Sequence, residues 1–249
     1  MKPCANLTLL FNERPFMERF AAAKEAGFDY VEVPLPYDVP VQDIVRELTI
    51  HDLKMVLINC PPPNYTGGAP GWAAVPGSRF QSDFKRALRY AQAMKVTHLH
   101  LMAGEAEGEE ARACFIENLR WAADQAPEHS LTIAPLNADD KPGYFLNDFG
   151  LAMEIIAAVD RPNVRIQYDT YHAQKIHGDA LQVWGDVKAR SVHVQVGQAP
   201  KRDEPWKGQI DFSALFATMK ADGYDGWISG AYIPAKTSEG GLGWLSLLD

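Results

Sequence analysis

The residues of this sequence that are best suited to chemistry lie at the ends of strand-like segments. Segment 163–172 alternates apolar and polar residues, which predicts a strand, and it delivers Asp169 and then His172 at its end. Many α/β enzymes build their sites in this way, because the carboxyl ends of parallel strands meet at one face. The alternative is that Asp169 only caps the next helix and that His172 lies at the surface.

Other strand-like segments end on residues with related chemistry. Asp169 and Gln195 carry oxygen donors that suit a hard divalent cation such as Mg²⁺ or Mn²⁺, although two oxygens are too few for tight binding. His100 and His172 could polarise a carbonyl, and either could equally be a structural histidine. Arg202, in a charged loop, could clamp a carboxylate bidentately or be a solvated loop charge. The strand-end candidates are Asn6 to Leu10, Glu32, Asn59, His100, Ala134, Asp169, Gln195 and Ala231.

Strand-like and helix-like segments alternate from one end of the chain to the other. Eight segments have strand character, and helical periodicity follows each of them without a break in composition. This pattern predicts one (β/α)₈ TIM barrel over residues 1–249. A doubly wound open sheet is the alternative, but no GxGxxG motif or P-loop follows the first strand, where that fold carries its phosphate-binding turn.

The expected strands are 5–11, 30–33, 54–59, 98–102, 131–134, 164–169, 191–196 and 226–231. The expected helices are 15–26, 41–51, 79–94, 109–123, 150–159, 180–187, 212–221 and 242–248. Residues 60–78 are rich in Pro and Gly and predict a long irregular loop, of the kind that often serves as a functional lid.

The overall composition limits the classes of function. The chain has 249 residues and a net charge of −8, which argues against nucleic acid or an anionic membrane as a partner. Its three cysteines are far apart and form no CxxC pattern, so a reducing compartment is expected. No signal-peptide h-region is present, and no apolar run reaches the roughly 18 residues that span a bilayer. We therefore expect a cytoplasmic protein.

Taken together, the motifs of this chain resemble those of one enzyme family. The sequence is similar to the hydroxypyruvate isomerase and 2-oxo-tetronate isomerase group of the xylose-isomerase-like barrels, over nearly its whole length. No single motif is specific, but the set is. It comprises residues 5–7 (Ala-Asn-Leu), 16–20, 36–38, 102–104, 135–137 (Pro-Leu-Asn), 143–146, 169–174 (Asp-Thr-Tyr-His-Ala-Gln), 193–195, 202–205 (Arg-Asp-Glu-Pro) and 240–244.

The resemblance implies a metal-assisted aldose–ketose isomerisation of a small hydroxy-oxo acid or sugar acid. In that family two glutamates move a proton through an enediol and also bind the divalent metal, and an Asp and a Gln complete the metal sphere. By motif, the Asp is Asp169 and the Gln is Gln195. The glutamate positions precede Pro-Leu-Asn and Tyr-Ile-Pro, and they are Ala134 and Ala231 in this chain.

Both expected carboxylates are therefore absent. Alanine can neither exchange a proton nor bind a metal, and general acid–base groups contribute about 10² to 10⁴ in rate each. Because residues of one catalytic unit do not act additively, the two factors are not multiplied. We expect strongly impaired turnover and weaker binding of Mg²⁺ or Mn²⁺. Either an engineered double substitution or a natural pseudoenzyme would explain the two alanines.

Other residues also have expected roles around the pocket. We expect His172 to take part in the reaction at the substrate carbonyl, and Arg202, His100 and Asn6 to bind the substrate. Segments 33–35 and 60–65 depart from the family pattern and put the identity of the substrate in doubt.

Two other functions compete with an impaired isomerase. One is a barrel that binds small molecules without turnover, and the other is a metal-dependent nuclease for abasic DNA, since related barrels have that activity. The acidic charge and the lack of a basic stripe argue against the nuclease. The sequence leaves open the exact substrate, the metal and whether the chain forms a homo-oligomer.

Overall fold

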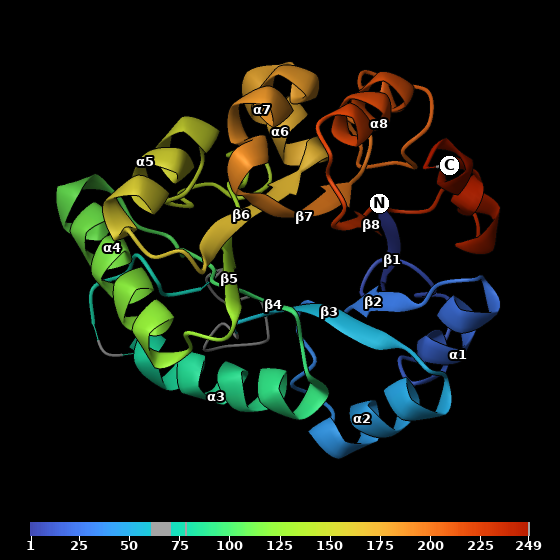
Figure 1. Cartoon of the computed structure of the whole chain (residues 1–249), viewed down its shortest axis with the longest axis horizontal. Coiled ribbons are helices and arrows are strands. Elements are labelled where there is room, and N and C mark those ends of the chain that lie inside the picture. The colour runs from blue at the N-terminus through green and yellow to red at the C-terminus, as the bar shows by residue number, and fades with distance from the viewer. Residues whose placement is uncertain (61–70, 78, 249) are drawn as a thin grey trace.

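The chain folds into a closed barrel of eight parallel strands, as the computed structural model shows for residues 1–60, 71–77 and 79–248. Each strand pairs with its neighbours in chain order, and β1 pairs with β8 to close the sheet. The helices surround the strands on the outside, and in this view both termini lie on the side of the barrel that carries β1 and β8 (Figure 1). The predicted TIM barrel is confirmed.

The strands are short and similar in length. They are β1 (Lys2–Asn6), β2 (Tyr30–Glu32), β3 (Lys54–Asn59), β4 (His98–His100), β5 (Ser130–Ile133), β6 (Val164–Asp169), β7 (Ser191–Val196) and β8 (Trp227–Gly230). The helices are α1 (Glu18–Glu25), α2 (Val41–Ile50), α3 (Arg79–Met94), α4 (Gly108–Gln125), α5 (Phe149–Val159), α6 (Thr170–His177), α7 (Ala180–Val187) and α8 (Phe212–Ala221), with 3₁₀ segments η1 (Lys188–Arg190) and η2 (Glu239–Leu247).

Each strand contributes buried apolar residues, because helices cover the outside of the barrel. The main core cluster contains residues from nearly every strand and helix, such as Phe20, Phe84 and Phe115 on the helices and Ile166 on β6. Most strands also carry buried polar side chains, and among these Glu32 and His193 are fully buried. No helix among the described residues is long and apolar enough to cross a membrane.

The first strand ends earlier than the sequence predicts. β1 stops at Asn6 instead of continuing to residue 11, because Asn6 Oδ1 accepts hydrogen bonds from the backbone N–H groups of Thr8 (3.0 Å) and Leu9 (3.2 Å). An Asx turn of this kind redirects the chain away from the sheet.

Two other predictions need correction. Helix α6 was not predicted; it starts directly after β6 and ends at Gly178, whose φ of 78° suits glycine. The predicted helix at 242–248 is a 3₁₀ segment, η2, which begins at Glu239. Of the predicted loop 60–78, residues 61–70 and 78 lie outside the described part of the chain.

The strand pairing sets the carboxyl-end residues side by side. Asn6 on β1 is in register with Glu32 on β2, and Asp169 on β6 is in register with Gln195 on β7. The barrel therefore places these residues in one layer at its carboxyl-terminal face, where TIM-barrel enzymes carry their active sites.

Candidate active site

A polar pocket of about 280 Å³ lies at the carboxyl ends of the strands. It brings together the six predicted site residues that have polar side chains, namely Asn6, His100, Asp169, His172, Gln195 and Arg202. The remaining lining residues are Thr8, Leu9, Pro34, Asn59, Met102, Ala134, Leu136, Asp140, Lys141 and Gln167. The strand ends thus form one pocket, as the barrel topology predicts.

Asp169 forms the strongest polar contact in this pocket. Its Oδ2 accepts a hydrogen bond from Arg202 Nη2 at 2.5 Å, and its Oδ1 accepts one from the backbone N–H of His172 at 3.1 Å. Burial alone would raise the pKa of Asp169, but the positive charge of Arg202 keeps that pKa below its usual value. The carboxylate is therefore ionised, paired and also the N-cap of α6.

Arg202 is held in place from several sides. Its Nε donates to the carbonyl oxygen of Ala231 at 2.7 Å, and its guanidinium lies 4.9 Å from the centre of the Tyr171 ring. The backbone of Arg202 has a φ of 60°, a left-handed conformation that is uncommon outside glycine. The backbone N–H of Ile233 donates to the Arg202 carbonyl at 2.8 Å, which supports this turn. Arg202 is thus a built part of the site and not a solvated loop charge.

The hydrogen bonds around His172 determine its tautomer. Asp140 fixes the orientation of the Asn137 side-chain amide through two hydrogen bonds of 3.1 Å. The backbone N–H of Asp140 donates to Asn137 Oδ1, and Asn137 Nδ2 donates to Asp140 Oδ2. His172 Nδ1 then faces two donors of Asn137, the backbone N–H at 3.1 Å and Nδ2 at 2.8 Å. Nδ1 is therefore unprotonated, and in neutral His172 the proton is on Nε2.

His172 Nε2–H is consequently opposed to a second donor. His172 Nε2 lies 3.2 Å from Arg202 Nη1, and a guanidinium nitrogen can only donate. Burial lowers the pKa of His172 to about 4, so the ring is neutral at pH 7. Two N–H groups point toward each other with no acceptor oxygen between them. A ligand oxygen in the pocket, to the side of the pair and within hydrogen-bond distance of both nitrogens, would accept from both.

Glu32, a strand-end candidate with no expected role, is a buried carboxylate behind the pocket. Glu32 accepts hydrogen bonds from Asn6 Nδ2, Gln195 Nε2 and His193 Nε2, each at 2.6 Å. Burial would raise the pKa of Glu32, but the charge of His193 and the hydrogen bonds from His193 and Gln195 lower it. The signal in the sequence is a lone Glu inside the apolar run 31–33.

The other two predicted substrate residues reach the pocket in different ways. Asn6 lines it, but its side-chain amide already bonds Glu32, Thr8 and Leu9. His100 also lines the pocket, and its buried Nδ1 has no hydrogen-bond partner among the described residues. Burial lowers the pKa of His100 to about 4, so it presents a neutral ring.

The two alanine positions differ in their access to the pocket. Ala134 is 2% exposed and lines it, whereas Ala231 is fully buried, is not among the lining residues and contributes its carbonyl oxygen to Arg202. At both positions the side chain has no group that can transfer a proton.

The side chains that are present do not fit a tightly held divalent metal. Asp169 is already paired with Arg202, and Gln195 Oε1 already accepts a hydrogen bond from Gln167 Nε2 at 2.9 Å. Mg²⁺ or Mn²⁺ prefers a larger set of free oxygen ligands. Among the described residues, no group of three or more His, Cys, Asp or Glu side chains could hold a metal ion.

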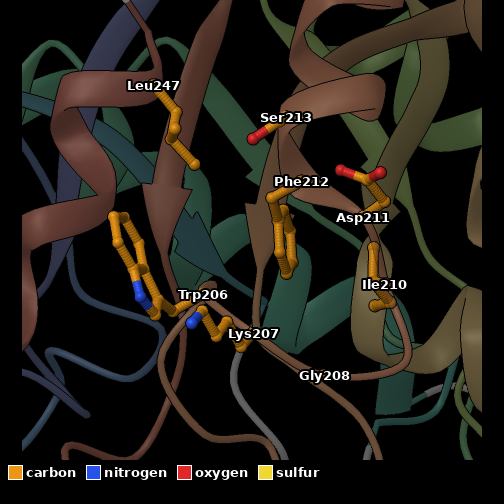
Figure 2. Close-up of a pocket in the computed structure, with 8 residues that line it drawn as sticks. All are labelled: Trp206, Lys207, Gly208, Ile210, Asp211, Phe212, Ser213 and Leu247. Atoms are coloured by element: carbon orange, nitrogen blue, oxygen red, sulfur yellow. The ribbon is translucent and has the colours of Figure 1, made fainter.

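A larger pocket, of about 410 Å³, lies elsewhere and contains none of the predicted site residues. Figure 2 shows it between Leu247 and the start of α8, with Trp206 and Lys207 on the loop that precedes the helix. The carboxylate of Asp211 is used there as the N-cap of α8. The strand-end pocket remains the candidate active site because it alone of the two gathers the predicted site residues.

A closed (β/α)₈ barrel with a polar pocket at its strand ends defines the class of this protein. The family model described as a xylose isomerase-like TIM barrel matches residues 20–248. The chain belongs to this family, and within it to the group of the 2-oxo-tetronate and hydroxypyruvate isomerases. The resemblance inferred from the motifs is confirmed.

Two relatives show how far the similarity extends. A 2-oxo-tetronate isomerase of Haemophilus influenzae is 37% identical, with 98% of this chain and 97% of the relative covered. A hydroxypyruvate isomerase of Escherichia coli is 33% identical, with 97% and 96% covered. The similarity therefore extends over nearly the whole chain.

Solved structures agree with the barrel. A protein from Brucella melitensis described as an AP endonuclease of family 2 has a TM-score of 0.94 and 40% identity, with 98% of both chains covered. A D-allulose 3-epimerase from Methylomonas has a TM-score of 0.76 at 18% identity, covering 95% of this chain and 85% of that one, which supports the fold alone.

Proposed function

We propose that the strand-end pocket binds a small hydroxy-oxo acid of the hydroxypyruvate or 2-oxo-tetronate type, and that the reaction of the intact site is an aldose–ketose isomerisation. The observation that carries this proposal is the pair of opposed donors, His172 Nε2–H and Arg202 Nη1–H, 3.2 Å apart in the pocket wall. Buried donors need an acceptor, and a carbonyl or carboxylate oxygen supplies one.

The pocket can hold such a ligand by ordinary hydrogen bonding. Three of the guanidinium N–H groups of Arg202 are directed at Ala231, His172 and Asp169, which leaves two for a substrate carboxylate or hydroxyl. Lys141 also lines the pocket and adds a second positive charge. A neutral His172 is suited to polarise the carbonyl, because it donates through Nε2–H.

Turnover needs more than binding. An isomerisation removes a proton from the carbon beside the carbonyl and returns one to its neighbour, so it requires a group of suitable pKa at the reacting carbons. The two lining carboxylates are already engaged, Asp169 with Arg202 and Asp140 with Asn137. We propose that Ala134 and Ala231 stand where the intact site has its acid–base pair, and that this chain is therefore strongly impaired.

We propose that Mg²⁺ or Mn²⁺ belongs to the intact site and is held weakly at best by this chain. A bound divalent metal would polarise the substrate carbonyl. Asp169 and Gln195 would be the remaining oxygen ligands, and each already accepts a hydrogen bond from a protein donor.

A ligand-binding barrel without turnover is the second candidate. It is favoured by the donor pair and the charges of the pocket, which are kept in the absence of the two carboxylates. Both candidates require the oxo acid to bind, and they differ in whether chemistry returns when the acids are restored.

The test is isomerisation of hydroxypyruvate with added Mg²⁺ or Mn²⁺, measured on this chain and on the Ala134→Glu/Ala231→Glu variant. We expect activity only in the variant, with a gain of at least about 10². Turnover by the unchanged chain at a similar rate would refute the placement of the acid pair. If a folded, ligand-binding variant stays inactive, the non-catalytic barrel is the better account.

A further inference from the structure

Glu32 organises the polar side chains beneath the pocket without lining the pocket itself. It is 0% exposed, and both of its oxygens are used. Oε1 accepts from Asn6 Nδ2 and Gln195 Nε2, and Oε2 accepts from His193 Nε2, all at 2.6 Å. An ionised carboxylate can only accept, so each of these three side chains must turn a donor toward it.

The consequence for Gln195 is a fixed orientation of its amide. The oxygen and nitrogen of an amide have nearly the same shape, so packing alone does not distinguish the two orientations. Glu32 selects the orientation in which Nε2 points into the barrel. Gln195 Oε1 then accepts from Gln167 Nε2 at 2.9 Å, and Gln167 Oε1 accepts from Thr132 Oγ1 at 3.4 Å.

These bonds form one chain with a single direction. It runs from Thr132 on β5 through Gln167 on β6 and Gln195 on β7 to Glu32 on β2, and in every link the donor lies on the side away from Glu32. Gln167 and Gln195 both line the pocket. An amide oxygen can accept two hydrogen bonds. Gln195 Oε1 accepts one from Gln167, so it can accept a second one from a ligand.

We propose that Glu32 is a positioning residue, which holds the Gln195 amide so that its oxygen accepts a hydrogen bond from the hydroxyl group of the hydroxy-oxo acid. The inference rests on the proposed function, since it assigns the contact that distinguishes a hydroxy-oxo acid from a plain oxo acid. Without the charge of Glu32, the amide of Gln195 can turn over and present N–H groups to the pocket.

The first experiment measures selectivity and not only affinity. Hydroxypyruvate and pyruvate differ by one hydroxyl group, so calorimetric titration of both isolates the contact to Gln195. We expect the unchanged chain to prefer hydroxypyruvate by about threefold to tenfold, the size of one net hydrogen bond. In Glu32→Gln the preference should fall below about twofold, with pyruvate affinity changed by less than about twofold.

A matched control separates positioning from simple loss of stability. His98 is also a buried polar residue of the barrel interior, but it bonds Ser130 and lies outside the Glu32 chain. His98→Gln should leave the selectivity unchanged, whereas Gln195→Leu should abolish it as Glu32→Gln does. Full selectivity in folded Glu32→Gln overturns the positioning role.

A second measurement needs neither a ligand nor a folded Glu32 variant. The side-chain amide of Gln195, assigned by its loss in Gln195→Leu, should show one downfield proton that exchanges slowly with water, because it is buried against a carboxylate. Two ordinary, rapidly exchanging amide protons would overturn the positioning role by themselves. If the amide behaves as expected but neither oxo acid binds, the failure lies in the proposed function and in the ligand contact.

Discussion

Asp169 and Arg202 form an ion pair that joins the end of β6 to the loop after β7, with 2.5 Å between Oδ2 and Nη2. Asp169 is almost completely buried, and the side chain of Arg202 is only 18% exposed. The pair gives the site an internal cation next to the carboxylate that the family resemblance assigns to the metal. It also fixes the arginine opposite His172.

Removing this carboxylate should destabilise the fold. Asp169→Asn leaves the Arg202 charge without its partner, and breaking a buried pair typically costs about 3–5 kcal/mol. We expect a loss of that size in the free energy of unfolding at pH 7, measured by urea denaturation. The matched control is Asp124→Asn, which breaks the exposed pair with Arg161 and should have little effect. Equal losses in the two variants would contradict the prediction.

The same pair sets a pH dependence of stability. The folded pKa of Asp169 is lowered, so its contribution is fully present above the unfolded value of about 3.9 and is lost as the pH falls through the folded pKa. The unchanged chain should therefore lose stability below about pH 4 more steeply than Asp169→Asn. Urea midpoints between pH 2 and 7 measure this difference, and parallel curves would contradict it.

The fold was predictable from the sequence because the alternation of strand and helix patterns is a local property. Apart from β1, the ends of the strands were predictable for the same reason, and Asp169, Gln195, His172 and Arg202 do line one pocket. What the sequence could not provide are the pairings. Glu32 and His193 are 161 positions apart, and only barrel closure brings them into contact.

Two local features were also hidden. Asn6 ends β1 through side-chain bonds to the backbone, so the apolar residues that follow it resemble a strand without forming one. Asp169 both ends a strand and caps a helix, so the predicted helix cap is confirmed, whereas its role in the site stays a prediction. His172, by contrast, is buried and not at the surface.

Ligand binding should be independent of pH over the neutral range. Burial lowers the pKa of His172 to about 4, so its ring stays neutral and donates through Nε2–H from pH 5.5 upward. We expect the affinity for hydroxypyruvate to change by less than about twofold between pH 5.5 and 8, measured by calorimetry. If a charged imidazole were needed, affinity would instead rise by up to about tenfold per pH unit toward acid.

Divalent metal should distinguish this chain from the variant with restored acids. At a hundredfold excess over its Kd, a ligand that binds only the native state stabilises it by about 2.7 kcal/mol. Millimolar Mn²⁺ should leave the Tm of this chain unchanged and raise that of Ala134→Glu/Ala231→Glu by several degrees. The single Asp169→Asn change in the restored variant should remove the effect. A clear rise of the Tm of the unchanged chain with Mn²⁺ would contradict the prediction and show that Asp169 and Gln195 are enough to bind the metal.

Gly71 lies against a residue of the pocket wall and has no room for a side chain. Its φ is 96°, and a Cβ atom there would lie 2.3 Å from the carbonyl oxygen of Met102, a pocket-lining residue. Gly108 is the matched control, because its φ is 80° but an added Cβ would meet nothing within 4 Å. Both glycines have a positive φ, and of the two only Gly71 has a clash with an added Cβ.

Gly108→Ala should therefore cost about 1–2 kcal/mol of unfolding free energy, the penalty of a left-handed conformation. Gly71→Ala should cost about 1–3 kcal/mol more, because the clash is with backbone and cannot be relieved by a rotamer change. Urea denaturation of both variants gives the difference, and equal losses would contradict the close approach. Since relief of the clash must displace Met102, Gly71→Ala should also weaken hydroxypyruvate binding, and Gly108→Ala should leave it intact.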